Sequence, residues 1–304
     1  MSQLKLGIAL GSGAARGWSH IGVLEALAAE SIHPNIICGS SIGSLVSAAY
    51  AADKLAELKH WVLALDKRFI FKLADISLFS SGSLIEGKKL IAELEKQIGE
   101  FKIENMPKPF ACVATDLQTG REIWLRQGDL WSAVRASMAL PGMFAPVRKE
   151  EHWLVDGGLV NPVPVSLCRA MGADIVIAVN LNSDIVGKHF AKQNPEEVNN
   201  NALVSWLGSW MSEDIRSRTN NFLKRINHDD EQNPSVFDVM ASAINIMQDR
   251  ITRSRMGGDP PDLSIRPQLS QVNLLDFDRG EELIEAGFDA VQAQIPFIKK
   301  MLNK

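Results

Sequence analysis

The chain has 304 residues, of which 46% are hydrophobic, and its formal net charge is −4. This length and apolar content are enough for one large domain or two small ones, with a sizeable core. The slightly acidic balance provides no general attraction to nucleic acid, so a nucleic-acid-binding protein is not expected.

The three cysteines, Cys38, Cys112 and Cys168, are widely spaced, and each lies in an apolar stretch. They are predicted to be buried free thiols in a reducing compartment, with no disulfide framework and no metal site. The N-terminus shows no signal-peptide pattern, and no uncharged apolar run reaches the ~18 residues of a membrane-spanning helix. We therefore expect a cytoplasmic protein whose only membrane contact, if any, is peripheral, at the inner membrane.

Strand and helix patterns alternate along the first 180 residues. Apolar runs bounded by turn residues predict strands, and apolar residues at helical spacing predict helices. The strands are expected at 6–10, 36–38, 109–115, 122–125, 153–155 and 174–179, and the helices at 18–30, 45–52, 129–138 and after Pro164. This order predicts an α/β fold with a parallel or mixed sheet covered by helices.

The character of the sequence changes after about residue 182. Residues 184–234 are mostly polar and predict a surface excursion. Beyond it we expect a long amphipathic helix from Ser235, an edge strand at 263–265, and a final helix from about Arg279 to near the end. The predicted division is therefore a core, 5–182, and a helical C-terminal extension, 183–304.

Ser41 stands in Gly39-Ser40-Ser41-Ile42-Gly43, between a predicted strand and a predicted helix. In that context a G-x-S-x-G sequence is typical of a nucleophile elbow. The flanking glycines let two backbone segments approach closely and tolerate strain at the serine. The alternative is a tight strand-to-helix turn that happens to contain a serine.

A second motif, Gly11-Ser12-Gly13-Ala14-Ala15-Arg16-Gly17, lies between a predicted strand and a predicted helix. Its small residues let consecutive backbone N–H groups converge at a helix N-terminus, which suits either a phosphate site or an oxyanion hole. A dinucleotide loop would need glycine in place of Arg16, and a P-loop would need lysine in place of Trp18. The oxyanion hole is therefore favoured, with a structural loop as the alternative.

A nucleophilic serine needs a base to take its proton. His189 and His228 follow in the polar excursion, without an apolar frame to hold an imidazole, and His20 is either a support for the glycine loop or an ordinary helix residue. Asp156 is the better candidate, because it ends a predicted strand before two glycines. Its ordinary pKa of ~3.9 would require a partly desolvated site. The alternative is that Asp156 caps a turn.

Together these motifs resemble the patatin-like phospholipase family, whose pattern is a glycine-rich loop with Arg-Gly, then G-x-S-x-G, then D-G-G or D-G-A. They stand here at 11–17, 39–43 and 156–158. The stretch from Ala136-Ser137 to Phe144-Ala145-Pro146 is similar to the family block that lines the active-site pocket. The chain looks most similar to the bacterial RssA branch of neuropathy-target-esterase-like proteins, except over 184–234.

The resemblance implies a three-layer patatin-like fold and a Ser–Asp dyad, with Ser41 as nucleophile and Asp156 as base. It implies an oxyanion hole in the glycine loop, formed by Gly11, Ser12, Gly13 and Ala14 with support from Arg16 and Gly17. It also implies an elbow with Gly39 and Gly43, and a D-G-G turn with Gly157 and Gly158. The implied pocket is lined by Ser137, Pro141 and Phe144. The diluted glycine run departs from the family pattern but keeps the backbone donors.

The activity that the resemblance implies is hydrolysis of a lipid acyl ester through an acyl-enzyme on Ser41, of the phospholipase, lysophospholipase or carboxylesterase type, without a metal or cofactor. An acyltransferase or thioesterase with the same dyad, and a regulatory protein that retains the fold, are the alternatives. Trp206 and Trp210 belong to an apolar stripe suited to a membrane interface. Packing of that stripe on the core or on a second subunit is the other reading, so a homo-oligomer is left open.

Overall fold

The computed structural model describes residues 4–73, 75, 85–184 and 236–302. The chain divides into two compact units, Met1–Asp184 with Gln248–Lys304, and Ile185–Met247. Most of the predicted surface excursion, including His189, His228 and the tryptophan stripe, lies outside the described residues, so the division of the chain at residue 182 stays a prediction.

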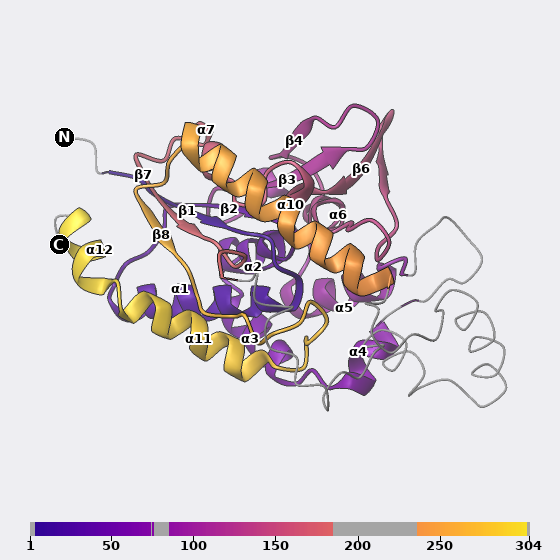
Figure 1. The fold of residues 1–304 in the computed structure, drawn as a ribbon, viewed down its shortest axis with the longest axis horizontal. Helices are drawn as coiled ribbons and strands as arrows, with labels where there is room; N and C mark the ends of the chain where they lie inside the picture. The colour runs from indigo at the N-terminus through magenta and orange to yellow at the C-terminus, as the bar shows by residue number, and fades with distance from the viewer. Residues whose placement is uncertain (1–3, 74, 76–84, 185–235, 303–304) are drawn as a thin grey trace, which may run out of the picture. The chain divides into compact units, whose positions relative to one another are not determined.

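A mixed sheet of eight strands forms the centre of the described part of the chain (Figure 1). The hydrogen-bonded order is β5-β6-β3-β2-β1-β7-β8, with β4 paired to β3. From β3 to β8 the pairs are parallel, whereas β4, β5 and β6 pair antiparallel. The strands are β1 (Leu6–Leu10), β2 (Ile36–Ser40), β3 (Phe110–Asp116), β4 (Glu122–Leu125), β5 (Val147–Lys149), β6 (His152–Asp156), β7 (Ile175–Val179) and β8 (Leu263–Ile265).

Helices connect and cover these strands. The α-helices are α1 (Ser19–Ala29), α2 (Ile42–Ala51), α3 (Leu55–Leu63), α4 (Lys67–Leu73), α5 (Lys88–Ile98), α6 (Leu130–Ser137), α7 (Val165–Ala170), α10 (Val236–Gly258), α11 (Gly280–Gln292) and α12 (Ile295–Met301). Short 3₁₀ helices are η1 (Ala14–Trp18), η2 (Ile103–Asn105) and η3 (Gly157–Leu159). Each predicted strand and helix of the first 180 residues is present within a few residues of its expected ends.

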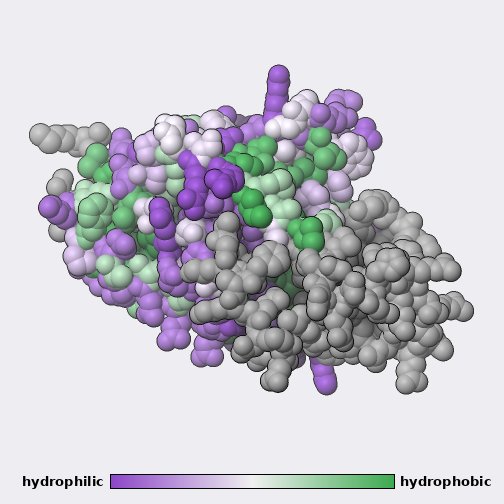
Figure 2. All heavy atoms as spheres, in the orientation of Figure 1, coloured by the Kyte–Doolittle hydropathy of each residue, from purple (hydrophilic) through white to green (hydrophobic). Residues whose placement is uncertain are grey.

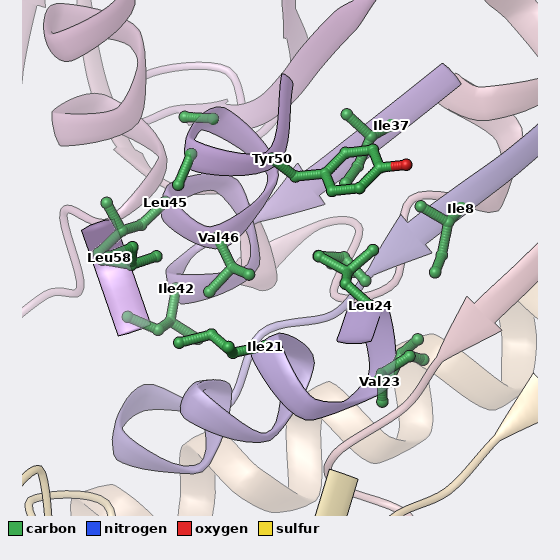
Figure 3. Close-up of a cluster of buried hydrophobic side chains, with 14 of the residues drawn as sticks. Ile8, Ile21, Val23, Leu24, Ile37, Ile42, Leu45, Val46, Tyr50 and Leu58 are labelled. Carbon is green, nitrogen blue, oxygen red and sulfur yellow. The ribbon is translucent and has the colours of Figure 1, made fainter. Parts of the chain in front are cut away.

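The side chains of β1 show how the sheet is buried on both faces. Successive side chains of a strand point to opposite faces. Ile8 and Leu10 join the larger apolar cluster, which Figure 3 shows between the sheet and helices α1, α2 and α3. Ala9 joins a smaller cluster that includes Leu167 of α7. Helices therefore cover both faces, and the predicted three-layer α/β fold is confirmed.

Helix α1, which follows the glycine loop, is held in place by α11 (Figure 1). Two glycines allow the helix backbones to touch. A Cβ on Gly22 would lie 1.8 Å from the Ile284 carbonyl oxygen, and a Cβ on Gly287 would lie 1.9 Å from the Ser19 carbonyl oxygen. Helix α11, near the C-terminus, therefore fixes the position of α1, which directly follows the glycine loop.

The prediction of one final helix is wrong, because two helices, α11 and α12, share that stretch. The break falls at residues 293–294, and Pro296 stands in the first turn of α12. Proline has no N–H and cannot continue a helix hydrogen-bond ladder, but it fits a first turn. Helices α3, α4 and α5 and strand β5 were not expected from the sequence.

On the visible face, apolar residues lie in small patches among hydrophilic ones (Figure 2). Cys38, Cys112 and Cys168 are buried and unbridged, as predicted. In the described ranges, no helix combines the length and apolar character needed to cross a membrane. In the same ranges, no group of three or more His, Cys, Asp or Glu side chains is placed to hold a metal ion.

Candidate active site

Strands β2 and β6 bring the elbow and the aspartate together from opposite directions. Ser40, the last residue of β2, pairs with Val113 of β3, and Asp156, the last residue of β6, pairs with Ala114. Strand β4 pairs with both Val113 and Ala114 from the other side. Therefore β2 and β6 lie on the same edge of β3, and their C-terminal ends meet there.

Ser41 follows β2 in a strained conformation. Its φ is 54° and its ψ is −128°, a left-handed φ that is costly for a residue with a side chain. The turn is so tight that the flanking residues must be glycine. A Cβ on Gly39 would lie 2.4 Å from the Gly43 carbonyl oxygen, and a Cβ on Gly43 would lie 2.3 Å from the Leu10 carbonyl oxygen. The turn has the tight, strained geometry expected of a nucleophile elbow, and the role of Ser41 as the nucleophile stays a prediction.

The Ser41 hydroxyl donates a hydrogen bond to Asp156. Ser41 Oγ and Asp156 Oδ2 are 2.5 Å apart, which is short even for a hydroxyl–carboxylate pair. The other carboxylate oxygen, Oδ1, accepts from the Gly158 N–H at 2.7 Å. The Asp156 main-chain oxygen accepts from Thr115 Oγ1, also at 2.7 Å. The carboxylate is thereby oriented at both oxygens.

Burial changes the acid strength of Asp156. The residue is fully buried. Desolvation raises its pKa to about 7, although the hydrogen bonds from Ser41 and Gly158 act in the opposite direction. A general base works best with a pKa near the operating pH, and the raised pKa brings the Asp156 carboxylate into that range.

Ser137, predicted as a pocket residue, contacts the elbow itself. Its hydroxyl oxygen accepts a hydrogen bond from the Ser41 N–H at 3.0 Å, and its side chain is fully buried. This bond satisfies a backbone donor that the strained turn would otherwise leave without a partner. Phe144 lies under the Arg135 guanidinium. The predicted roles of Phe144 and Pro141 in lining a pocket stay predictions.

Two of the four predicted oxyanion donors are already engaged. The Gly11 N–H donates to the Val179 oxygen at 3.0 Å, and the Ser12 N–H donates to the Pro162 oxygen at 2.9 Å. The prediction is corrected here, because an N–H that is bound to a carbonyl cannot also serve an oxyanion. Within the described part of the chain, the N–H groups of Gly13 and Ala14 have no hydrogen-bond partner.

Arg16 orients the Gly13–Ala14 peptide. The Gly13 carbonyl oxygen accepts from Arg16 Nε at 3.1 Å and from the Arg16 N–H at 3.2 Å. In a planar trans peptide the N–H points away from the carbonyl, so fixing this oxygen also fixes the Ala14 N–H. Burial lowers the pKa of Arg16 to about 10, with Asp184 opposing the change, so the side chain stays charged at neutral pH.

His20 supports the loop and is not placed as a base. Its Nε2 lies 2.8 Å from the Gly11 carbonyl oxygen, to which it donates, and the ring is fully buried. Burial lowers its pKa to about 4, so the imidazole is neutral at pH 7. Its hydrogen bond goes to the loop, whereas the hydroxyl of Ser41 is bound to Asp156.

The glycines of the three motifs pack the loop, the elbow and the aspartate turn against one another. A Cβ on Gly17 would lie 2.3 Å from Cγ2 of Ile42, the residue directly after Ser41. One on Gly157 would lie 2.9 Å from Ser40 Oγ, and one on Gly158 would lie 3.0 Å from Ser12 Oγ. Side chains at these positions would separate the parts of the site.

The sequence did not indicate two buried amides beside the loop, Asn182 and Gln248. Gln248 Oε1 accepts from Ser12 Oγ at 3.0 Å and from Asn182 Nδ2 at 2.9 Å. Gln248 was assigned to an amphipathic helix, where a glutamine is ordinarily a surface residue. Only its low exposed fraction, 5%, distinguishes Gln248 from a surface glutamine on such a helix.

An elbow serine bonded to a buried carboxylate, beside a loop with two unengaged N–H groups, defines a serine hydrolase-like site on an α/β sheet. The sequence model described as patatin-like phospholipase matches residues 8–169. The chain therefore belongs to the patatin-like phospholipase family and is an enzyme of the phospholipase and esterase class.

Individual relatives narrow the family further. An uncharacterized NTE family protein of Mycobacterium tuberculosis is 31% identical, over 94% of this chain and 90% of that protein, so the chain is of the NTE type. Lysophospholipase NTE1 of Pyricularia oryzae is 28% identical over 98% of this chain, which spans 19% of that protein. Among solved structures, VipD from Legionella pneumophila aligns with a TM-score of 0.44 and 11% identity, over 96% of this chain and 66% of that one.

Proposed function

We propose that the protein hydrolyses lipid acyl esters with a Ser–Asp dyad, in which Ser41 is the nucleophile and Asp156 is the base. One observation carries the proposal, the 2.5 Å hydrogen bond from Ser41 Oγ to Asp156 Oδ2 at a strained elbow. The hydroxyl already points its proton at the group that would receive it. A pKa of about 7 makes that group able to do so near neutral pH.

The proposed reaction has two halves. Ser41 Oγ bonds to the ester carbonyl carbon while its proton moves to Asp156. The tetrahedral intermediate then collapses, and the leaving alcohol takes the proton from Asp156, which leaves an acyl-enzyme. Water attacks that acyl group with its proton passing to Asp156. Collapse of the second intermediate releases the fatty acid and returns the proton to Ser41.

The oxyanion of each intermediate is proposed to bind the N–H groups of Gly13 and Ala14. These two donors have no partner in the described ranges, unlike those of Gly11 and Ser12. The carbonyl of Gly13 is held by Arg16, so the Ala14 N–H needs no reorganisation during the reaction. One such donor typically contributes ~3 kcal/mol of transition-state stabilisation.

The proposed substrate is a phospholipid or a lysophospholipid. The Pyricularia oryzae relative is named a lysophospholipase and aligns with 98% of this chain, which supports the second of these. Water-insoluble substrates are reached at an interface, so peripheral membrane contact through Trp206 and Trp210 remains part of the proposal. Both tryptophans lie outside the described residues.

The test is Ser41→Ala, assayed with a short-chain acyl ester and with a fluorophosphonate probe that labels nucleophilic serines. We expect loss of both hydrolysis and labelling. Ser47→Ala is the matched control, because Ser47 lies on α2, the helix that begins directly after Ser41, and its buried hydroxyl has no partner among the described residues. Full activity of Ser41→Ala, in a protein that melts like the wild type, would overturn the proposal.

Product analysis separates hydrolysis from the alternatives with the same dyad. Incubation with a lysophospholipid should release free fatty acid without an added acceptor. An acyltransferase would instead form acylated product only when an acceptor alcohol is present, and a thioesterase would prefer an acyl thioester to the matching oxygen ester. A protein that binds lipid but turns over none of the three substrates would be a regulatory relative.

A further inference from the structure

The Gln248 amide, which lies on α10, is held on one side by the glycine loop. Its Oε1 accepts hydrogen bonds from Ser12 Oγ at 3.0 Å and from Asn182 Nδ2 at 2.9 Å. Both donors are buried, with exposed fractions of 2% and 1%. A carbonyl oxygen has two lone pairs, so these two donors satisfy it and leave the amide one orientation.

The other end of the same amide lies over the aspartate turn. A Cβ on Gly158 would lie 2.5 Å from Gln248 Nε2 and 3.0 Å from Asp156 Oδ1. The Gly158 N–H donates to that same Oδ1. The Gln248 amide thus packs directly on the turn that orients Asp156 while it binds the loop with its oxygen.

Asn182 extends the network to the loop backbone. Its Nδ2 lies 3.5 Å from the Ser12 carbonyl oxygen, a long hydrogen bond. That carbonyl shares a planar peptide with the Gly13 N–H, one of the two unengaged donors. By binding Asn182, Gln248 therefore limits rotation of the peptide that carries this donor.

We propose that Gln248 is a positioning residue that holds the glycine loop and the Asp156 turn at a fixed position relative to each other. The inference rests on the proposed function, because it assigns catalytic roles to the Gly13 N–H and to Asp156. Gln248 contacts Ser12 and Asn182 on one side and Gly158 on the other. It therefore sets the distance between the Gly13 N–H and the Asp156 carboxylate. A misplacement of about 1 Å in such an arrangement costs about 100-fold in rate.

The test is Gln248→Leu, which keeps the side-chain volume but removes the amide. For a short-chain ester we expect kcat to fall about 10- to 100-fold while KM changes less than about twofold. Gln97→Leu is the matched control, since it also loses a glutamine hydrogen bond, the 2.8 Å contact to Glu93 on α5. It should keep the wild-type kcat. A folded Gln248→Leu enzyme with wild-type kcat would overturn the proposal.

Ser12→Ala keeps the inference testable if Gln248→Leu does not fold. It removes one hydroxyl and should lower kcat with little change in KM. Because both changes break the same contact, the double variant should lose less than the product of the two single losses. Independent, multiplicative losses would contradict the network. If Ser41→Ala is inactive while both positioning variants are normal, only this inference fails; an active Ser41→Ala removes the proposed function itself.

Discussion

The hydroxyl of Ser41 and the carboxylate of Asp156 are in hydrogen-bond contact although 115 positions separate them in the chain. The contact follows from the sheet, because β2 and β6 end against each other on one edge of β3. The proposed nucleophile thus follows a parallel strand, and the proposed base ends an antiparallel one. The arrangement leads to four predictions.

Asp156→Asn should abolish hydrolysis while preserving the fold. Asparagine has nearly the same shape but cannot take the Ser41 proton, and a general base contributes about 10²- to 10⁴-fold. The loss in kcat with a short-chain ester measures the effect. Asp116→Asn is the control, because Asp116 is another buried aspartate, bound to Gln118 and His152. Equal losses in both variants would argue against a specific role of Asp156.

The rate should depend on pH through Asp156. Only the carboxylate form can accept a proton, and burial raises the pKa of this group to about 7. We therefore expect kcat/KM to fall about tenfold per pH unit below that value and to level off above it. A pH series with an uncharged ester substrate tests this. A profile that is flat from pH 5 to pH 8 would contradict the prediction, because it would show that no carboxyl with a pKa near 7 controls the rate.

Stability should show the opposite pH dependence. Since the pKa of Asp156 is about 7 in the folded state against an ordinary 3.8, the folded state binds more protons between those values. The contribution of Asp156 to the free energy of unfolding is therefore present below about pH 4 and is lost as pH rises through about 7. The loss is on the order of 4 kcal/mol.

Urea unfolding at pH 5 and pH 8 measures this contribution. Asparagine does not titrate. The free energy of unfolding of Asp156→Asn should therefore rise relative to that of the wild type as the pH rises. Only the difference between the two pH values is predicted, because the substitution also changes local hydrogen bonds. Parallel pH dependence of the two proteins would mean that Asp156 is not desolvated in the folded state.

Gly43→Ala should destabilise the protein by about 3 kcal/mol, because its Cβ would lie 2.3 Å from the Leu10 carbonyl oxygen. Backbone on both sides leaves no flexible group to move. Gly257→Ala is the matched control, since a Cβ added there on α10 would meet, within 4 Å, no heavy atom of the described residues beyond its chain neighbours and its own helix backbone. It should be neutral or stabilising by up to about 1 kcal/mol. Chemical denaturation compares the two, and similar midpoints would contradict the tight elbow.

Local sequence patterns predicted much of the fold. The strand at residues 6–10 and the helix after Ser41 depend mainly on neighbouring residues, as does the elbow between its two glycines. Helix α4, rich in charged and aromatic residues, and the three-residue strand β5 had no comparable signal. The break before α12 has one local signal, Pro296, because proline fits the first turn of a helix but not its interior.

The residue types and order of the site were readable from the sequence alone: a serine elbow, a small-residue loop and an aspartate before two glycines. These depend on local backbone requirements. Only the tertiary structure decided that the Gly11 and Ser12 N–H groups are engaged, that burial raises the pKa of Asp156, and that Gln248 joins the loop to the turn. Each is set by packing between segments far apart in the chain, because hydrogen-bond partners and desolvation are properties of the assembled core.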